Sequence, residues 1–139
     1  MAHRQIIITE ADRDRLHALL ASEFVEVIGP VEYLADLKAE LQRATIVPPE
    51  KAPRNVVTMN STVIFRTESS DKEFALTLVY PNDIGDGAGK ISILAPVGSA
   101  LLGLREGDEI SWPKPGGGLL KVRVLKVVYQ PERAGDFRR

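Results

Sequence analysis

The segment Lys90–Ile110, KISILAPVGSALLGLREGDEI, decides how the second half of the chain folds. A short run of β-branched residues, Ile91–Ile93, predicts a brief strand. A short helix is expected over Pro96–Leu102, because proline suits a first helical turn and Gly103 is the kind of residue that ends a helix. Gly107, with the aspartate that follows it, then predicts a turn into another strand.

The sequence on either side predicts further strands. Segments rich in β-branched and aromatic residues occupy Val56–Thr67, Glu73–Tyr80, Asp108–Trp112 and Leu119–Tyr129. Together with the brief strand and the short helix, they predict a compact α+β domain. The aromatic side chains on these strands are expected in the core, although they could also line a ligand groove.

The beginning of the chain has a helical pattern instead. The apolar spacing over 12–22 predicts an amphipathic helix, which Thr9 and Asp12 introduce as a weak capping box. A Gly-Pro pair at 29–30 breaks the chain, and a second apolar stripe runs from there to about Thr45. Two such helices joined by a loop predict a short antiparallel helical hairpin.

The boundary between these two patterns is rich in proline. Three prolines within the seven residues Val47–Pro53 cannot continue a helix, and they predict an extended, semi-rigid connection. The sequence therefore divides into a helical hairpin at 1–47, a proline-rich linker at 48–53 and a strand-rich domain at 54–139.

The composition excludes several classes of protein. The 139 residues include no cysteine, which excludes disulfides, thiolate metal sites and a cysteine nucleophile. The two histidines, His3 and His17, do not suggest a metal site, and no cofactor is expected. A net charge of −1 argues against direct, sequence-specific nucleic-acid binding. No apolar run approaches the about 18 residues of a membrane span, and no signal-peptide core is present, so a cytoplasmic location is expected.

Catalytic motifs are weak. The glycine-rich stretches Asp83–Gly89 and Pro113–Gly118 lack the Walker pattern, so plain turns are favoured over nucleotide binding. No Gly-x-Ser-x-Gly elbow is present, and both histidines lie in the helical half of the chain, away from the strand-rich domain. We therefore expect a protein that is not an enzyme.

Acidic residues gather near the turn of the predicted hairpin. Glu23, Glu26 and Glu32 lie in a stretch, Leu16–Leu37, that contains no lysine or arginine. Such a tip could hold a divalent cation or meet a basic partner surface. The alternative is that these charges are simply solvated, as charges in loops usually are.

The Lys90–Ile110 segment resembles the C-terminal signature of the Gre transcript-cleavage factors, the GreA/GreB transcription elongation factor family. In that signature a turn ending in proline leads into a short Ala-Leu-Leu-Gly helix, then Gly-Asp and a strand. The resemblance implies an N-terminal coiled-coil hairpin and an FKBP-like C-terminal domain with an antiparallel sheet and one short helix. It also implies binding to RNA polymerase near the entrance of the secondary channel.

Other segments are more similar to the Rnk family, the regulators of nucleoside diphosphate kinase, than to Gre factors. These segments are the opening Ile-Ile-Ile-Thr, Val56–Ser61, Leu78–Pro81, Ala95–Arg105 and Tyr129–Asp136. They occur in a shared order along nearly the whole chain. The resemblance implies an effect on the level of nucleoside diphosphate kinase, so this kinase is a second candidate partner.

The Gre resemblance also assigns roles to single residues. The turn before the short helix faces the polymerase in Gre-type domains, which carries over to Leu94, Ala95 and Pro96. Leu101 and Leu102 are expected behind them in the core. Some Gre proteins have an acidic residue at the position that Leu94 occupies here. The contact of this turn with the polymerase is therefore expected to be more apolar or weaker.

The length of the hairpin argues against one Gre activity. Helices of about 11 and 16 residues span only about 16 to 24 Å, whereas a Gre hairpin is several turns longer. Glu23 and Glu26 have the spacing of the acids at a Gre tip, but they would not reach the polymerase centre. We therefore predict polymerase binding without stimulation of transcript cleavage. The alternatives are direct contact with nucleoside diphosphate kinase and, less favoured, a prolyl isomerase activity of the FKBP-like fold.

Overall fold

The structure, a computed structural model, describes residues 6–21, 32–67, 72–85, 88–113 and 118–135. In chain order its elements are β1 (Ile7–Thr9), α1 (Glu10–Leu20), α3 (Glu32–Arg43), β2 (Thr45–Val47), the 3₁₀ turn η1 (Pro49–Lys51), β3 (Thr62–Thr67), β4 (Glu73–Val79), the 3₁₀ turn η2 (Pro81–Asp83), β5 (Lys90–Ser92), α4 (Pro96–Leu101), β6 (Glu109–Pro113) and β7 (Leu119–Tyr129). This mixture of a sheet and a few helices confirms the predicted α+β class. None of the helices described is long and apolar enough to cross a membrane.

Five strands form the main sheet, in the order β5-β4-β3-β7-β6. The pairs β3–β4, β3–β7 and β6–β7 are antiparallel, but β4 and β5 run parallel. The prediction of an antiparallel sheet is therefore wrong at this edge. After β4 the chain passes through η2 and returns to the start of the β4 pairing at Thr77, so β5 runs in the same direction as β4. The Thr77 amide donates to the Gly89 carbonyl at 2.9 Å, directly before β5 begins.

The predicted strand Val56–Thr67 is wrong in its first half, because β3 begins only at Thr62. Residues 56–61 are all buried, so they lack the alternation between a buried and an exposed face that a strand of this sheet has. Asn60 has a φ of 68°, which turns the chain out of an extended path. This segment instead bonds to two others: Val57 N–H donates to Leu104 O at 2.8 Å, and Asn60 N–H donates to Leu78 O at 2.6 Å.

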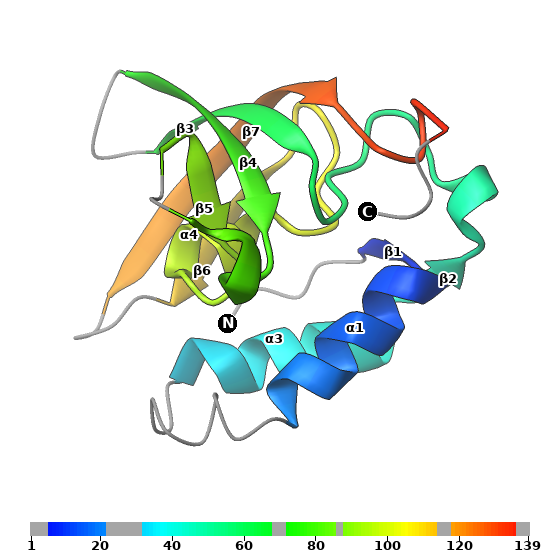
Figure 1. The fold of residues 1–139 in the computed structure, drawn as a ribbon. Helices are drawn as coiled ribbons and strands as arrows, with labels where there is room; N and C mark the ends of the chain where they lie inside the picture. The colour runs from blue at the N-terminus through cyan, green and yellow to red at the C-terminus, as the bar shows by residue number, and fades with distance from the viewer. Residues whose placement is uncertain (1–5, 22–31, 68–71, 86–87, 114–117, 136–139) are drawn as a thin grey trace.

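Two helices form near the N-terminus, where the leucine spacing predicts them. The Thr9 hydroxyl accepts a hydrogen bond from the Asp12 amide at 3.2 Å, which confirms the predicted cap, although α1 starts at Glu10. The strands at the two ends of this unit, β1 and β2, pair in parallel, with Ile8 opposite Ile46. This pairing joins the start of α1 to the end of α3, so the two helices form a hairpin that is closed at its base (Figure 1).

The proline-rich connection is not fully extended, contrary to the prediction. Residues Pro49–Lys51 form the 3₁₀ turn η1, in which the Ala52 amide donates to Pro49 O at 3.2 Å. Proline favours this outcome, because its fixed φ suits the first position of a helical turn as well as an extended chain.

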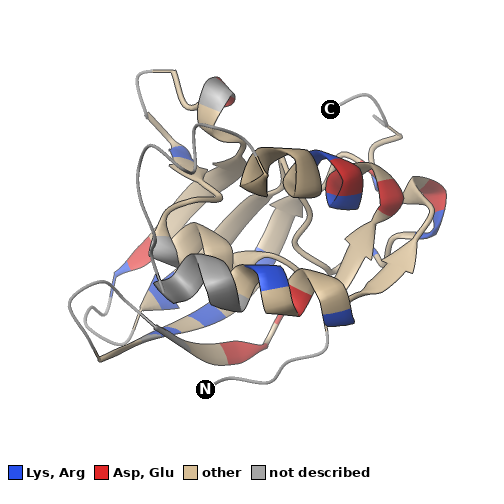
Figure 2. Cartoon of the chain, turned by 90° about the horizontal axis from the view of Figure 1, so that it is seen from below, with Lys and Arg blue, Asp and Glu red and all other residues tan. Residues whose placement is uncertain are grey.

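The α1–α3 hairpin and the main sheet share one hydrophobic core. Buried side chains of the hairpin, among them Leu16, Leu20, Leu37 and Leu41, belong to the same cluster as those of α4 and of the inner face of the sheet. Figure 2 views the molecule from the hairpin side and shows the helices in front of the strands. Because this packing is continuous between the hairpin and the sheet, the division of the chain at residues 48–53 stays a prediction from the sequence.

Candidate functional site

The turn that leads into α4 is rigidly built. The Ser99 hydroxyl donates to Ile93 O at 2.6 Å, and the Ala95 amide donates to Ser92 O at 3.0 Å. A side chain at Gly98 would overlap the Ser92 carbonyl oxygen, so only glycine allows this close approach of helix and turn. The backbone of residues 92–96 is therefore held by contacts from both ends.

The three predicted contact residues differ in what they expose. Leu94 is 8% exposed and belongs to the core cluster, whereas Ala95 is half-buried. Pro96 opens α4 as its first residue. Leu101 and Leu102 are buried, which confirms their predicted place in the core. The surface offered by this turn is therefore the Ala95 side chain and the adjacent backbone more than the Leu94 side chain.

The predicted acids of the hairpin tip are not brought together by the described part of the structure. Glu23 and Glu26 lie outside the described residues, and Glu32 is the first residue of α3. Within the described ranges, no three His, Asp or Glu residues gather to form a metal site.

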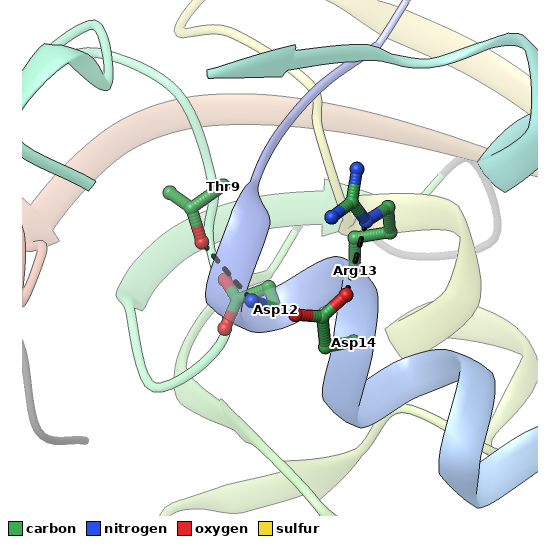
Figure 3. A network of polar contacts seen from close by, with 4 residues as sticks. All are labelled: Thr9, Asp12, Arg13 and Asp14. Carbon is green, nitrogen blue, oxygen red and sulfur yellow. Dashed lines mark hydrogen bonds and ion pairs between the residues drawn. The ribbon is translucent and has the colours of Figure 1, made fainter. Parts of the chain in front are cut away.

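A buried carboxylate, which the sequence did not reveal, joins the hairpin to the sheet. Asp12, in the first turn of α1, is 2% exposed. Its Oδ2 atom accepts the Met59 amide at 3.1 Å, and its Oδ1 atom accepts the Tyr80 hydroxyl at 3.2 Å. Figure 3 shows the Thr9 cap beside Asp12. It also shows the neighbouring ion pair of α1, in which Arg13 Nε lies 3.1 Å from Asp14 Oδ1 and both side chains are solvent-accessible. Asp12 thus fixes one end of the hairpin to two separate points of the sheet domain.

A second carboxylate lies close to the first. The Thr58 hydroxyl donates to Glu132 Oε1 at 2.6 Å and also contacts Ser61 Oγ at 2.9 Å. Burial and, second, the charge of Glu132 raise the pKa of the Asp12 carboxyl from 3.8 to about 6. Burial and then the Asp12 charge raise the pKa of the Tyr80 hydroxyl above its ordinary value. The junction therefore brings two carboxylates together and raises the pKa of the Asp12 carboxyl well above its ordinary value.

Two surface hollows are lined by described residues. One, of about 330 Å³, lies between α1 and α3 and is lined by His17, Leu20, Ala21, Lys38, Leu41 and Gln42. The other, of about 190 Å³, lies on the open face of the sheet and is lined by Arg66, Thr67, Glu109, Lys121 and Arg123. None of the described residues that line them is a phenylalanine, tyrosine or tryptophan, whereas a prolyl isomerase pocket would need an aromatic lining.

Two family models match this chain. The model described as "Transcription elongation factor, GreA/GreB, C-term" matches residues 51–129, and "Rnk N-terminus" matches residues 4–47. The "Regulator of nucleoside diphosphate kinase" of Escherichia coli strain K12 is 45% identical over 138 residues, which cover 99% of this chain and 98% of that protein. The chain belongs to the Rnk family.

Other relatives of this Rnk family protein are named as elongation factors. The "Transcription elongation factor GreA" of Helicobacter hepaticus is 33% identical over 91% of this chain and 81% of that protein. A solved structure, "Prokaryotic transcription elongation factor GreA/GreB from Nitrosomonas europaea", superimposes with a TM-score of 0.71 at 56% identity and covers 91% of this chain and 100% of that one. These relatives are regulators or elongation factors rather than catalysts.

The junction at Asp12 unites three of the segments in which the sequence resembles Rnk proteins. Residues 56–61, 78–81 and 129–136 supply Met59, Tyr80 and Glu132 respectively. The presence of these residues in separate Rnk-like segments is the signal that could have found the site. Sequence reasoning missed it because the local pattern around its centre, Asp12, predicts only a helix cap.

Proposed function

We propose that this Rnk family protein binds RNA polymerase at the entrance of the secondary channel and does not stimulate transcript cleavage. The proposal rests on one combination: a GreA/GreB-type sheet domain carrying a hairpin whose described helices, α1 and α3, are short. At 1.5 Å per residue, the 11 residues of α1 and the 12 of α3 correspond to about 17 and 18 Å. The longer Gre hairpin implied by the resemblance would exceed this reach by several helical turns. Such a role would place the protein in the cytoplasm.

Within this proposal, the turn 92–96 contacts the polymerase through Leu94, Ala95 and Pro96. Its rigid backbone supports the assignment, because a pre-formed surface loses little conformational entropy on binding. Ala95 and the exposed backbone beside it would make most of the contact, since the Leu94 side chain is largely occupied in the core.

Binding and cleavage are tested with separate measurements. Purified protein should retain core RNA polymerase in a pull-down, and added GreA should displace it. Backtracked elongation complexes should release no extra cleavage product at saturating protein, whereas GreA in parallel should. Absence of binding would overturn the whole proposal. Binding accompanied by accelerated cleavage would overturn its second half.

Direct contact with nucleoside diphosphate kinase is the second candidate, because the E. coli relative is named as a regulator of that enzyme. A pull-down with purified kinase, and a kinase activity assay with and without the protein, distinguish direct contact from control of the kinase level. A prolyl isomerase activity is the third candidate, supported only by the FKBP-like resemblance. A coupled assay on a proline-containing peptide, with an FKBP as positive control, tests it.

A further inference from the structure

Four charged residues form a straight row across the open face of the sheet. In register, Glu73 of β4 lies opposite Arg66 of β3, Arg66 lies opposite Arg123 of β7, and Arg123 lies opposite Glu109 of β6. Their neighbours along β3 and β7, such as Phe65 and Val124, are buried, so the row lies on the side away from the core. The order of charges across the four strands is negative, positive, positive, negative.

Among the described residues, only one of the two inner arginines has an acidic partner. Arg66 forms an ion pair with Glu73 at 3.4 Å, but Glu109 pairs with Lys121 at 3.5 Å rather than with Arg123. Among the residues that the structure describes, Arg123 forms no ion pair. Like charges directly opposite each other on neighbouring strands are destabilising. A carboxylate placed over the arginines would remove that repulsion and could accept hydrogen bonds from both guanidinium groups.

The surroundings of the arginine pair restrict the anion that can bind. The hollow beside it, which Thr67 and Lys121 also line, measures about 190 Å³, too little for a whole nucleotide. Glu73 and Glu109 flank the pair at both ends of the row and would repel a polyanion that extends across the strands. These features favour a single acidic side chain over a nucleic acid or a polyphosphate.

An exposed apolar residue lies on the same strand. Leu119 is 59% exposed and precedes Arg123 by four residues on β7. Four residues of a strand span about 13 Å, so the apolar and the cationic points are that far apart. An extended peptide would match this spacing with an acidic and an apolar side chain four residues apart.

We propose that Arg66, Arg123 and Leu119 form a docking surface for an extended protein segment that carries one carboxylate and, four residues away, one apolar side chain. The surface lies on the face of the sheet that α4 and the hairpin leave open. It is distinct from the turn 92–96, so it would provide a second contact, independent of the channel-entrance role.

The test uses the peptide acetyl-Glu-Ser-Thr-Ser-Leu-amide as a probe of the unidentified segment. The peptide is titrated into ¹⁵N-labelled full-length protein, and amide shifts are followed by NMR. We expect saturable shifts at Arg66, Leu119 and Arg123, with a Kd on the order of 1 mM, as suits one charge-assisted contact and one small apolar contact. Replacing Glu by Gln in the peptide should weaken binding about tenfold.

Two variants localise the effect. Arg123→Gln and Arg66→Gln should each weaken the peptide about tenfold, whereas Lys126→Gln is the matched control. Lys126 is an exposed cation on the same strand but outside the row, so its loss should change the Kd less than twofold. Each variant is checked for native amide dispersion before titration.

Three results would overturn the proposal: equal binding of the Gln peptide, equal weakening by Lys126→Gln, or tighter saturation of the same amides by tripolyphosphate. The last result would identify a general polyanion site instead. Because no polymerase is used, failure of this test leaves the proposed function standing, and failure of the polymerase pull-down leaves this surface standing.

Discussion

Ile6 occupies the space that a side chain at Gly103 would need. A Cβ at Gly103 would overlap the Cβ and Cγ2 atoms of Ile6, and Gly103 has a φ of 80°. The first described residue of the chain is thereby packed against the end of α4, nearly one hundred residues later. This contact ties the N-terminal strand β1 to the sheet domain independently of Asp12.

Gly103→Ala should therefore lower the free energy of unfolding by about 2–4 kcal/mol, which combines left-handed backbone strain with overpacking. Urea unfolding followed by circular dichroism measures the change. Gly107→Ala is the matched control, since Gly107 has a φ of 90° but a Cβ added there would meet nothing within 4 Å. It should lose only about 1–2 kcal/mol, the strain alone. Equal losses of unfolding free energy in both variants would show that the Ile6 side chain can move aside at little cost.

Acidification should stabilise the fold through Asp12. Its pKa is raised to about 6 in the folded protein, from 3.8, so the folded state binds this proton more tightly than the unfolded state does. The contribution is present at low pH and is lost as the pH rises through 6. Between pH 7.5 and pH 5 it should amount to about 1 kcal/mol.

Asp12→Asn should abolish this part of the pH dependence, because the amide keeps an acceptor for Met59 but does not titrate. The measurement is urea unfolding at pH 5 and pH 7.5, and the quantity of interest is the difference between wild type and variant. Asp14→Asn serves as control, since the Asp14 side chain is 72% exposed. An unchanged pH dependence in Asp12→Asn would assign it to other groups.

Leu94 and Ala95 should separate stability from partner binding. Leu94→Ala removes a core side chain and should cost about 2–3 kcal/mol of stability. Ala95→Asp should leave the unfolding free energy within about 0.5 kcal/mol, because this side chain is half-buried at the surface of the turn. If the turn contacts RNA polymerase, Ala95→Asp should weaken the pull-down about tenfold or more. Undiminished binding by a folded Ala95→Asp variant would remove the turn from the interface.

The arginine pair of the open face should reduce stability in the absence of a partner. Arg123→Thr removes the repulsion from Arg66 and introduces a residue that favours strands, so we expect a gain of about 0.5 kcal/mol. Thermal unfolding at low and at high salt measures it. The gain should shrink at high salt, which screens the repulsion. A loss of stability at both salt concentrations would show that Arg123 contributes more by packing than it costs by charge.

Local signals predicted the parts of the fold that depend on neighbouring residues. Thr9 caps α1, and Pro96 and Gly103 bound α4 and its following turn, because each acts on the backbone beside it. Leu16, Leu20, Leu37 and Leu41 are buried, as the leucine spacing of the two helices predicts, and Leu19 is partly buried. Such features are readable from one sequence because the partners lie within a turn of each other.

The predictions that were wrong or missing concern residues whose hydrogen-bond partners lie far away in the sequence. Val56–Ser61 reads as a strand by composition, but its hydrogen bonds go to Leu104 and Leu78, and Asn60 turns the chain. The burial of Asp12 depends on an amide 47 residues away and a hydroxyl 68 residues away. No local pattern reports such distances, so a residue type that is usually exposed was not expected in the core.

The parallel pairing of β1 with β2 has a consequence for how the hairpin can vary. The chain enters the hairpin through β1 and leaves it through β2, and these two strands are paired. The base of the hairpin is therefore independent of its length at the far end. Adding about seven residues there, one turn to each helix, would extend the hairpin by about 5.4 Å and leave every contact at the base in place. Insertions at the far end can therefore change the length of the hairpin in steps of one helical turn without altering the fold that supports it.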